Sequence, residues 1–317
     1  MNATPDPPGP AIIEIVEVAP RDGLQNEKRL LPTETKIELV RRSVDAGLRR
    51  VEVTAFARPD LVPQMADAAE VLAGVADLEG LSMIGLVLNR RGVERAIAAG
   101  CDEITAVVVA SDGLALRNQG RDTAAQIEAW LQIAADARSA DLKTSVILAA
   151  AFGCPFDGEV PAERVIDVAR RCLAGAPDEL AIADTIGVGV PTQVRALVAG
   201  LRALPDLDPA TPLRAHFHNT RNTGYANAVA AIESGVTVLD ASTGGIGGCP
   251  FAPGATGNIA TEDLLYLLDR SADVEVAQPA GRPLDHAAIA ATGTWIATEL
   301  GLPQAPAQLG RAGWFPA

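Results

Sequence analysis

The chain has 317 residues, 48% of them hydrophobic, and a formal net charge of −14. This is enough apolar material for a sizeable core, in one large α/β domain or two smaller ones. The acidic balance and the lack of a Lys/Arg block argue against partners such as nucleic acid or an anionic membrane. No apolar run approaches the length that spans a membrane.

Residues 1–10 are rich in proline and have neither the basic start nor the apolar centre of a signal peptide. We expect a disordered leader and a cytoplasmic protein. The four cysteines show no C-x-x-C spacing, which argues against a zinc ribbon and a disulfide framework. Free cysteines are usually inert core residues, and we expect this of Cys101 and Cys172.

β-rich segments alternate with helix-like stretches along the chain. The predicted strands cover residues 12–18, 51–53, 82–88, 104–109, 145–151, 180–183, 213–218 and 236–239. The predicted helices cover residues 33–46, 61–74, 90–99, 122–139, 161–173, 191–203 and 222–234. Eight strands alternating with helices over about 250 residues predict an α/β fold of the (β/α)₈ TIM-barrel type. A doubly wound dinucleotide-binding sheet fits less well, because no G-x-G-x-x-G follows the first strand.

Four of the helices end in a small residue and a glycine just before a strand. The glycines are Gly47, Gly100, Gly175 and Gly235. Glycine at this place ends a helix in the left-handed conformation, so we expect a positive φ at each.

We expect the barrel to occupy residues 11–285. Residues 286–317 predict a short C-terminal helical extension and a tail packed on the barrel. No linker suggests a second folded domain.

His216 and His218 are two of only three histidines, and they stand one residue apart at the end of a strand-like run. Side chains alternate along a strand, so both imidazoles should project to the same side. Two imidazoles from one strand make half of a divalent-metal site. The alternative is a pair of hydrogen-bonded core histidines.

Other polar residues are expected at the carboxyl ends of the strands, where barrels carry their active sites. Arg21 and Asp22 follow the first strand, Glu52 lies in the second and Asp184 ends the sixth. A glycine-rich loop, residues 243–258, follows the eighth. Each residue has an ordinary alternative: a turn or helix-capping aspartate, a solvated strand end, or an outward-facing charge. An acid in a buried strand needs a partner, however, which favours a function for Glu52.

These residues stand in several longer motifs. The chain resembles the 3-hydroxy-3-methylglutaryl-CoA lyase family, within a superfamily of metal-dependent barrel lyases and Claisen-type synthases. The motifs lie at residues 17–27, 62–67, 184–189, 247–252 and 257–263. Arg-Asp-Gly and His-x-His are shared across the superfamily, whereas the Gly-Gly-Cys-Pro loop at 247–250 separates the lyases from the synthases.

The resemblance implies that Asp22, His216, His218 and Asn258 ligate a divalent cation, Mg²⁺ or Mn²⁺. A divalent cation bound by one carboxylate, two neutral imidazoles and an amide keeps a net positive charge. It also keeps open coordination positions for substrate oxygens.

The resemblance also implies a reaction, the cleavage of 3-hydroxy-3-methylglutaryl-CoA to acetyl-CoA and acetoacetate in leucine degradation. A base removes the hydroxyl proton, the C2–C3 bond breaks, and the acetyl-CoA enolate is protonated. Arg21 would stabilise the enolate oxygen. Cys249 and His216 are candidates for proton transfer, with Glu52 and Asp184 as supporting acids. The expected partner is an acyl-CoA substrate, and the expected assembly a homodimer or homotetramer.

The chain departs from better-known members at three places. It has Ser145-Val146-Ile147 where they carry an Arg-Gly-Tyr segment, Ala181 where they often carry a serine, and Arg221 after the histidines. We expect these changes to alter polarity at the barrel mouth, beside the distal carboxylate of the substrate. Citramalyl-CoA or another branched 3-hydroxyacyl-CoA is therefore an alternative substrate. Arg221 would compensate if it points toward the metal; otherwise we expect poor cleavage of 3-hydroxy-3-methylglutaryl-CoA.

Two other classes of function are weaker. A Claisen-type synthase would use the same metal ligands, but the Gly-Gly-Cys-Pro loop and the lack of a regulatory C-terminal domain argue against it. A non-catalytic CoA-binding protein would be expected to lose a ligand or Arg21, and all are present.

Overall fold

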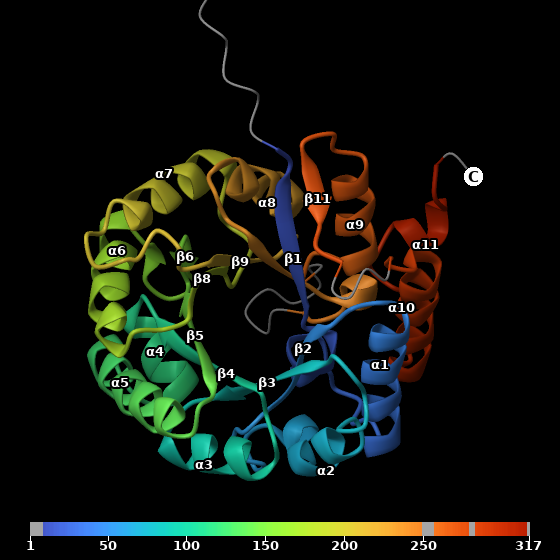
Figure 1. The fold of residues 1–317 in the computed structure, drawn as a ribbon, viewed down its shortest axis with the longest axis horizontal. Helices are drawn as coiled ribbons and strands as arrows, with labels where there is room; N and C mark the ends of the chain where they lie inside the picture. Colours follow the sequence, from blue (N-terminus) through green and yellow to red (C-terminus); the bar gives the residue numbers. More distant parts are fainter. Residues whose placement is uncertain (1–8, 249–256, 279–282, 316–317) are drawn as a thin grey trace, which may run out of the picture.

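The computed structural model describes residues 9–248, 257–278 and 283–315. Within these ranges eight parallel strands form a closed barrel, because β10 pairs with β1 as well as with β9 (Figure 1). The barrel strands are β1 (Ala11–Glu17), β2 (Arg50–Ala55), β3 (Ser82–Val87), β4 (Glu103–Val109), β5 (Lys143–Ala149), β8 (Glu179–Asp184), β9 (Leu213–Phe217) and β10 (Val238–Ala241). The predicted TIM barrel is confirmed.

The helices that connect the strands form an outer ring around the barrel (Figure 1). They are α1 (Thr33–Asp45), α2 (Ala68–Ala73), α3 (Arg90–Ala98), α4 (Asp112–Gln119), α5 (Thr123–Ser139), α6 (Ala162–Cys172), α7 (Pro191–Arg202) and α8 (Gly224–Glu233). The chain continues with α9 (Thr261–Asp269), β11 (Val274–Val276), α10 (His286–Leu300) and α11 (Leu309–Ala312).

Two connections differ from the sequence prediction. The helix expected over 61–74 is a 3₁₀ turn, Pro63–Met65, followed by the short α2. Helix α4 was not predicted, because its few buried apolar residues do not repeat at helical spacing. Its ends are local signals: the Ser111 side chain accepts from the backbone N–H of Leu114, and Gly120 ends the helix with a φ of 67°.

Three of the four glycines behave as predicted. Gly47, Gly100 and Gly235 have φ values of 102°, 79° and 93°. The prediction for Gly175 is wrong, since Ala176 takes the left-handed conformation instead, with a φ of 45°. Gly175 is needed for space, because a Cβ there would lie 2.7 Å from Nε1 of Trp130.

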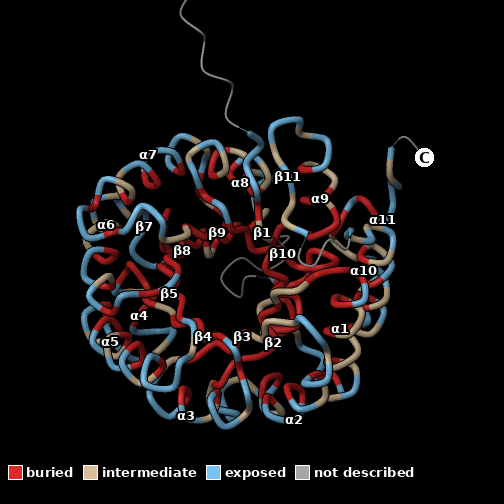
Figure 2. Tube along the Cα trace, viewed as in Figure 1, coloured by how far each residue is buried: buried red, intermediate tan, exposed pale blue. Residues whose placement is uncertain are grey.

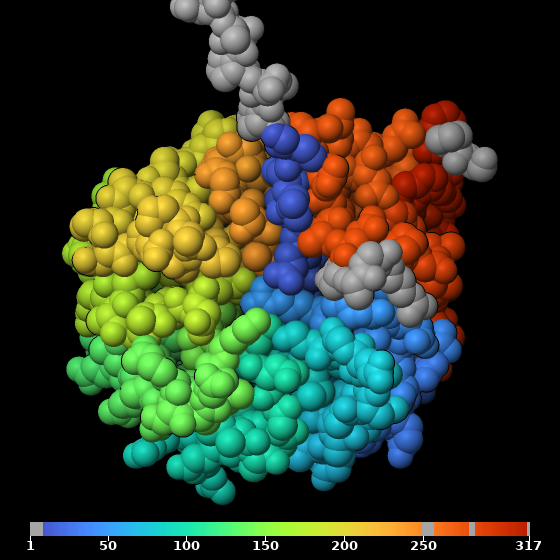
Figure 3. All heavy atoms as spheres, in the orientation of Figure 1, coloured from blue at the N-terminus to red at the C-terminus, as the bar shows by residue number. Residues whose placement is uncertain are grey.

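The main apolar core lies between the barrel wall and the ring of helices. Figure 2 shows the strands as a buried inner ring and the exposed residues on the periphery. Atoms form a continuous surface over this face of the molecule (Figure 3), and buried side chains fill the inside of the barrel. Many of these are polar: Glu52, Glu103, Thr105 and Arg214 are all buried there. In a buried strand such groups need partners, and the site is built from them.

The C-terminal elements pack on the barrel. β11 pairs with the start of β1, and α10 packs against α1 and the turn after β10. The indole of Trp314 stacks on His286, with ring centroids 4.6 Å apart. Within the described residues, no helix is both long and apolar enough to cross a bilayer. Most of the predicted leader, residues 1–8, lies outside the described part.

Candidate active site and metal centre

The turn after β1 carries Arg21 and Asp22. Ala19–Gly23 (η1) forms one turn of π-helix at the carboxyl end of the strand, a geometry often found at functional sites. No side chain fits at Gly23, because a Cβ there would lie 2.8 Å from Cγ1 of Ile246. Glycine therefore lets this turn pack closely on the loop after β10.

Buried Glu17 ties η1 to the same loop. Its carboxylate accepts hydrogen bonds from the backbone N–H of Ala19 (2.8 Å) and of Thr243 (2.9 Å). It also accepts from the hydroxyl groups of Thr243 (2.5 Å) and Thr261 (2.8 Å). The bonds to Ala19 and Thr243 hold η1 and the loop after β10 as one unit.

The two imidazoles meet Asp22 inside the barrel mouth. Nε2 of His216 lies 3.8 Å and Nε2 of His218 4.0 Å from Oδ2 of Asp22, and the ring centroids are 5.1 Å apart. One ligand atom from each of the three residues fits within a mutual distance of 4.8 Å. The structure thus brings a carboxylate and two imidazoles to one point, on the same side of β9.

Asn258 completes this group. It forms an antiparallel bridge with His218, and its Nδ2 donates to Oδ2 of Asp22 at 2.9 Å and to the carbonyl of Ile246 at 3.1 Å. Its Oδ1 is buried and has no hydrogen-bond partner among the described residues. A buried amide oxygen without a partner, beside a carboxylate and two imidazoles, fits a divalent cation that accepts oxygen and nitrogen ligands.

Arg21 is held between two carboxylates. Its Nε donates to Oε2 of Glu52 at 2.6 Å, and its Nη1 donates to Oδ1 of Asp22 at 2.7 Å. Glu52 is fully buried and faces the barrel interior, which excludes the alternative of an outward-facing charge. The two carboxylates outweigh the cost of burial and raise the pKa of Arg21 above its ordinary value. Arg21 therefore stays charged although its side chain is buried.

Asp22 is also held in its charged form. Burial works to raise its pKa, but the charge of Arg21, the two imidazoles and the Asn258 amide outweigh burial and lower the pKa. An ionised carboxylate is the form that ligates a metal.

The two histidines differ in their affinity for protons. Burial tends to lower the pKa of His216, but its hydrogen bond with Asp240 and the charge of Asp22 raise the pKa overall. Burial, His216 and Arg21 lower the pKa of His218 to about 4. At neutral pH His218 is therefore a neutral imidazole, as a metal ligand must be.

Asp184 holds its own turn. Its two carboxylate oxygens accept from the backbone N–H groups of Val188 (2.9 Å) and Gly189 (2.8 Å). Burial raises its pKa, and these two hydrogen bonds partly offset the rise. Asp184 thus ends β8 and binds the loop that follows, without a direct bond to Asp22 or either ligand histidine among the described contacts. Cys249 lies outside the described residues.

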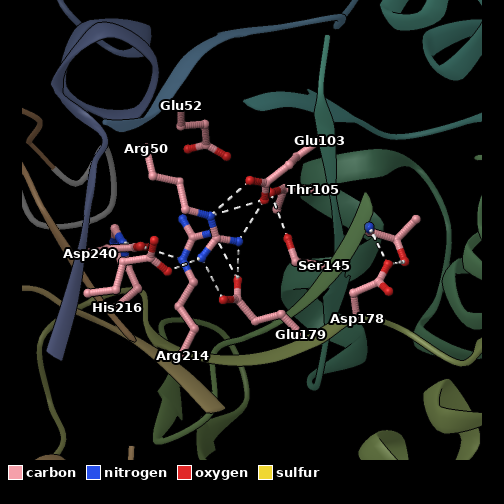
Figure 4. Close-up of polar contacts among 12 residues, drawn as sticks. Arg50, Glu52, Glu103, Thr105, Ser145, Asp178, Glu179, Arg214, His216 and Asp240 are labelled. Carbon is pink, nitrogen blue, oxygen red and sulfur yellow. Dashed lines mark hydrogen bonds and ion pairs between the residues drawn. The ribbon is translucent and has the colours of Figure 1, made fainter. Parts of the chain in front are cut away.

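Sequence reasoning did not select a group of charged side chains that lies with His216 inside the barrel (Figure 4). They are Arg50, Glu103, Glu179, Arg214 and Asp240. A charged residue within a buried strand is the signal that singled out Glu52, and the same signal marks Arg214 in the predicted strand 213–218. The other four stand one residue outside the predicted strands, and the observed strands extend to include them.

The expectation for Ser145 is wrong. Ser145 lies in the lower half of β5, pairs in register with the first residue of β8 (Glu179), and shares a 2.8 Å hydrogen bond with Thr105. Strands of a barrel carry substrate at their carboxyl ends, so Ser145 is too deep to change the polarity of the mouth. Ala181, on the same strand as Glu179, is also fully buried and packs with Ile147 and Ala183.

Arg221 binds the neighbouring loop. Its Nη1 donates to the carbonyl groups of Ile186 and Gly187, each at 3.0 Å. The Arg221 guanidinium therefore binds the backbone of the loop between β8 and α7. For this arrangement we expect measurable but poor cleavage of 3-hydroxy-3-methylglutaryl-CoA.

Known proteins share both the sequence and the fold. The chain is 43% identical to a (R)-citramalyl-CoA lyase of Chloroflexus aurantiacus over 311 residues, 95% of either protein. It is 40% identical to a hydroxymethylglutaryl-CoA lyase of Bacillus subtilis, over 83% of this chain and 87% of the relative. A solved HMG-CoA lyase from Acinetobacter baumannii, in complex with coenzyme A and 3-methylmalate, superposes with a TM-score of 0.88 at 33% identity, covering 96% of each chain.

The profile of the HMGL-like family matches residues 12–296. This match and the near-full-length relatives confirm the predicted family: the chain belongs to the HMGL-like family.

Proposed function

We propose that the protein is a divalent-metal-dependent carbon–carbon lyase that cleaves 3-hydroxy-3-methylglutaryl-CoA to acetyl-CoA and acetoacetate. The observation that carries this proposal is the convergence of Asp22, His216 and His218 beside Arg21 at the mouth of the barrel. The family relationship supports the type of reaction, since relatives that cover most of the chain are lyases of 3-hydroxyacyl-CoA compounds.

Asp22, His216, His218 and Asn258 would hold the cation. Mg²⁺ or Mn²⁺ fits this mixture of oxygen and neutral nitrogen donors. When bound, the cation makes a coordinated hydroxyl group more acidic and polarises substrate oxygens. Asp22 and Asn258 come from η1 and the loop after β10, which Glu17 holds together, so the ligand set is preorganised.

Arg21 would stabilise the negative charge of the acetyl-CoA enolate. Glu52 and Asp22 fix two edges of its guanidinium, so the remaining donors have a defined direction. A fixed cation stabilises charge that develops in the transition state without reorganising.

Proton transfer is assigned to Cys249 and His216, with Glu52 and Asp184 in support. The segment that carries Cys249 begins and ends at the site. A Cβ on Gly247 would lie 2.5 Å from Nδ2 of Asn258, and one on Gly257 would overlap the carbonyl oxygen of Gly247. Glycine at both ends lets the chain leave and re-enter beside the metal ligands.

Citramalyl-CoA is the second candidate substrate. The 43% identical relative is a citramalyl-CoA lyase and matches over 95% of the chain, whereas the Bacillus hydroxymethylglutaryl-CoA lyase matches over 83%. Arg221 binds loop carbonyls, so it supplies no evident partner for a distal carboxylate. We place the protein in the cytoplasm, as a homodimer or homotetramer. With the first substrate it would act in leucine degradation.

A substrate screen tests the proposal. Protein loaded with Mg²⁺ or Mn²⁺ is incubated with 3-hydroxy-3-methylglutaryl-CoA, citramalyl-CoA and longer branched 3-hydroxyacyl-CoAs, and acetyl-CoA release is measured. Acetoacetate formed with the first substrate supports the main proposal, and a higher kcat/KM with citramalyl-CoA supports the second. Release from neither, or condensation of an acyl-CoA with a 2-oxo acid, would overturn both.

A further inference from the structure

Arg214 connects the lower part of the barrel interior to the metal centre. It is fully buried on β9, two residues before His216. Its Nε donates to Oδ1 of Asp240, and its Nη1 lies 3.4 Å from Oε1 of Glu179 (Figure 4). The guanidinium is therefore fixed from two directions, by carboxylates on β10 and β8.

Asp240 connects this guanidinium to a proposed metal ligand. Its Oδ2 lies 3.0 Å from Nδ1 of His216, so its two oxygens contact two different residues. An imidazole that donates its Nδ1 proton to a carboxylate keeps the lone pair on Nε2. Nε2 of His216 is the atom that faces Asp22.

The orientation of Asp240 therefore matters to His216. The carboxylate of Asp240 can rotate about its Cβ–Cγ bond, and few orientations point an oxygen at the imidazole. The bond from Nε of Arg214 to Oδ1 of Asp240 selects such an orientation, because a guanidinium presents its donors in a rigid plane.

We propose that Arg214 is a positioning residue for the metal centre. By holding Asp240, it fixes the tautomer and the orientation of His216. This inference rests on the proposed function only in taking His216 as a metal ligand. The tautomer itself is a property of the metal-free protein.

Arg50 offers a matched control. Its guanidinium also lies inside the barrel and binds Glu179 (2.8 Å), together with Glu103 (2.7 Å) and Glu14 (3.0 Å). Its described contacts include neither Asp240 nor His216. Removing Arg50 therefore takes a buried guanidinium away from Glu179, as removing Arg214 does, without touching the bond between Asp240 and the imidazole.

The test compares Arg214→Met with Arg50→Met. The protein contains three histidines, so ¹⁵N spectra of histidine-labelled, metal-free protein can be assigned by single substitutions. At a pH high enough to keep the imidazole neutral, we expect His216 of the wild type as the Nδ1–H tautomer. Arg214→Met should give a mixture of tautomers and raise the Kd for Mn²⁺ about tenfold, in the range of outer-shell effects at metal sites. Arg50→Met should change neither readout, although both variants should be less stable.

Arg214→Lys keeps the positive charge but cannot contact Asp240 and Glu179 through a planar fork. It should lie between the wild type and Arg214→Met in both readouts, and it replaces Arg214→Met if that variant does not fold. The inference is overturned if Arg214 and Arg50 variants change the tautomer equally, or if the Arg214 variants leave it unchanged. Failure of the wild type to bind Mn²⁺ would instead contradict the proposed function, and the tautomer comparison would still decide the role of Arg214.

Discussion

The side-chain amide of Asn258 donates to Oδ2 of Asp22, the same oxygen that faces Nε2 of both His216 and His218. These residues come from the beginning, the middle and the far end of the chain, and the closure of β10 onto β1 brings them together. The amide is held from one side only, which leaves its Oδ1 available to a cation.

We therefore predict that Asn258→Ala raises the Kd for Mn²⁺ at least as much as loss of an outer-shell partner does, about 10- to 100-fold, because a direct ligand is lost. Isothermal titration of metal-free protein measures this. Asn227→Ala is the control, because Asn227 is a fully buried asparagine on α8 that also has an unpartnered Oδ1. Unchanged affinity in Asn258→Ala, or equal weakening in both variants, would contradict the ligand assignment.

Arg21→Lys should lower kcat about 100-fold or more, because one ammonium replaces a fork that contacts Glu52 and Asp22 and stabilises the enolate. Affinity for Mn²⁺ should change little, since the positive charge remains. Steady-state kinetics and metal titration on the same preparation separate the two effects. Turnover near that of the wild type would show that Arg21 does not stabilise the reaction.

Cys249→Ala should fold, bind metal and lose most cleavage, because the loop that carries it leaves and re-enters at the site. Cys154→Ala is the control, since Cys154 shares the Gly-Cys-Pro-Phe sequence but is buried in the β6 strand (Gly153–Cys154). Thiol alkylation should inactivate the wild type, and substrate should protect it. Full activity after alkylation of Cys249 would make this cysteine structural.

Metal binding should depend on pH through one histidine at a time. Protons compete with the metal for His216 already above pH 6.5, because the pKa of His216 is raised, whereas His218 takes up a proton only near pH 4. As the pH falls through this window, the Kd for Mn²⁺ should rise about tenfold per pH unit. A titration series shows the slope. A hundredfold rise per unit, starting near pH 6.5, would mean that both histidines titrate together.

Arg221→Ala should change kcat/KM by about twofold or less for both 3-hydroxy-3-methylglutaryl-CoA and citramalyl-CoA, because this side chain binds loop carbonyls. If Arg221 instead paired with the distal carboxylate, its removal would cost a few kcal/mol of transition-state stabilisation. The kcat/KM for 3-hydroxy-3-methylglutaryl-CoA would then fall roughly 100-fold. Parallel kinetics on the two substrates distinguish these outcomes.

Much of this architecture could be predicted from the sequence. Hydrophobic strands alternating with helices, and glycines such as Gly47 and Gly235 at the helix ends, specify the barrel through local signals. The alternation along β9 predicts that both imidazoles share one side. The placement of Asp22 and Asn258 beside them follows from barrel closure, which makes the ends of the chain neighbours.

The positions of the polar and charged side chains inside the barrel were harder to predict. Ser145 was expected at the mouth, because a sequence gives the strand but not the depth of a residue along the barrel axis. Depth follows from register, and Ser145 pairs with Glu179 at the lower end. Arg214 and Asp240 each stand in an apolar strand, and their pairing depends on two side chains that meet only after β9 and β10 align.

The most direct measurement of the central claim is acetyl-CoA release from chelator-treated protein as Mn²⁺ is added back. The account predicts no cleavage of 3-hydroxy-3-methylglutaryl-CoA or citramalyl-CoA without metal, and full activity at one Mn²⁺ per chain. It also predicts that substitution of His218 by alanine abolishes both stoichiometric binding and the recovery of activity. Cleavage that persists without metal, or that recovers equally in the His218→Ala variant, would contradict it.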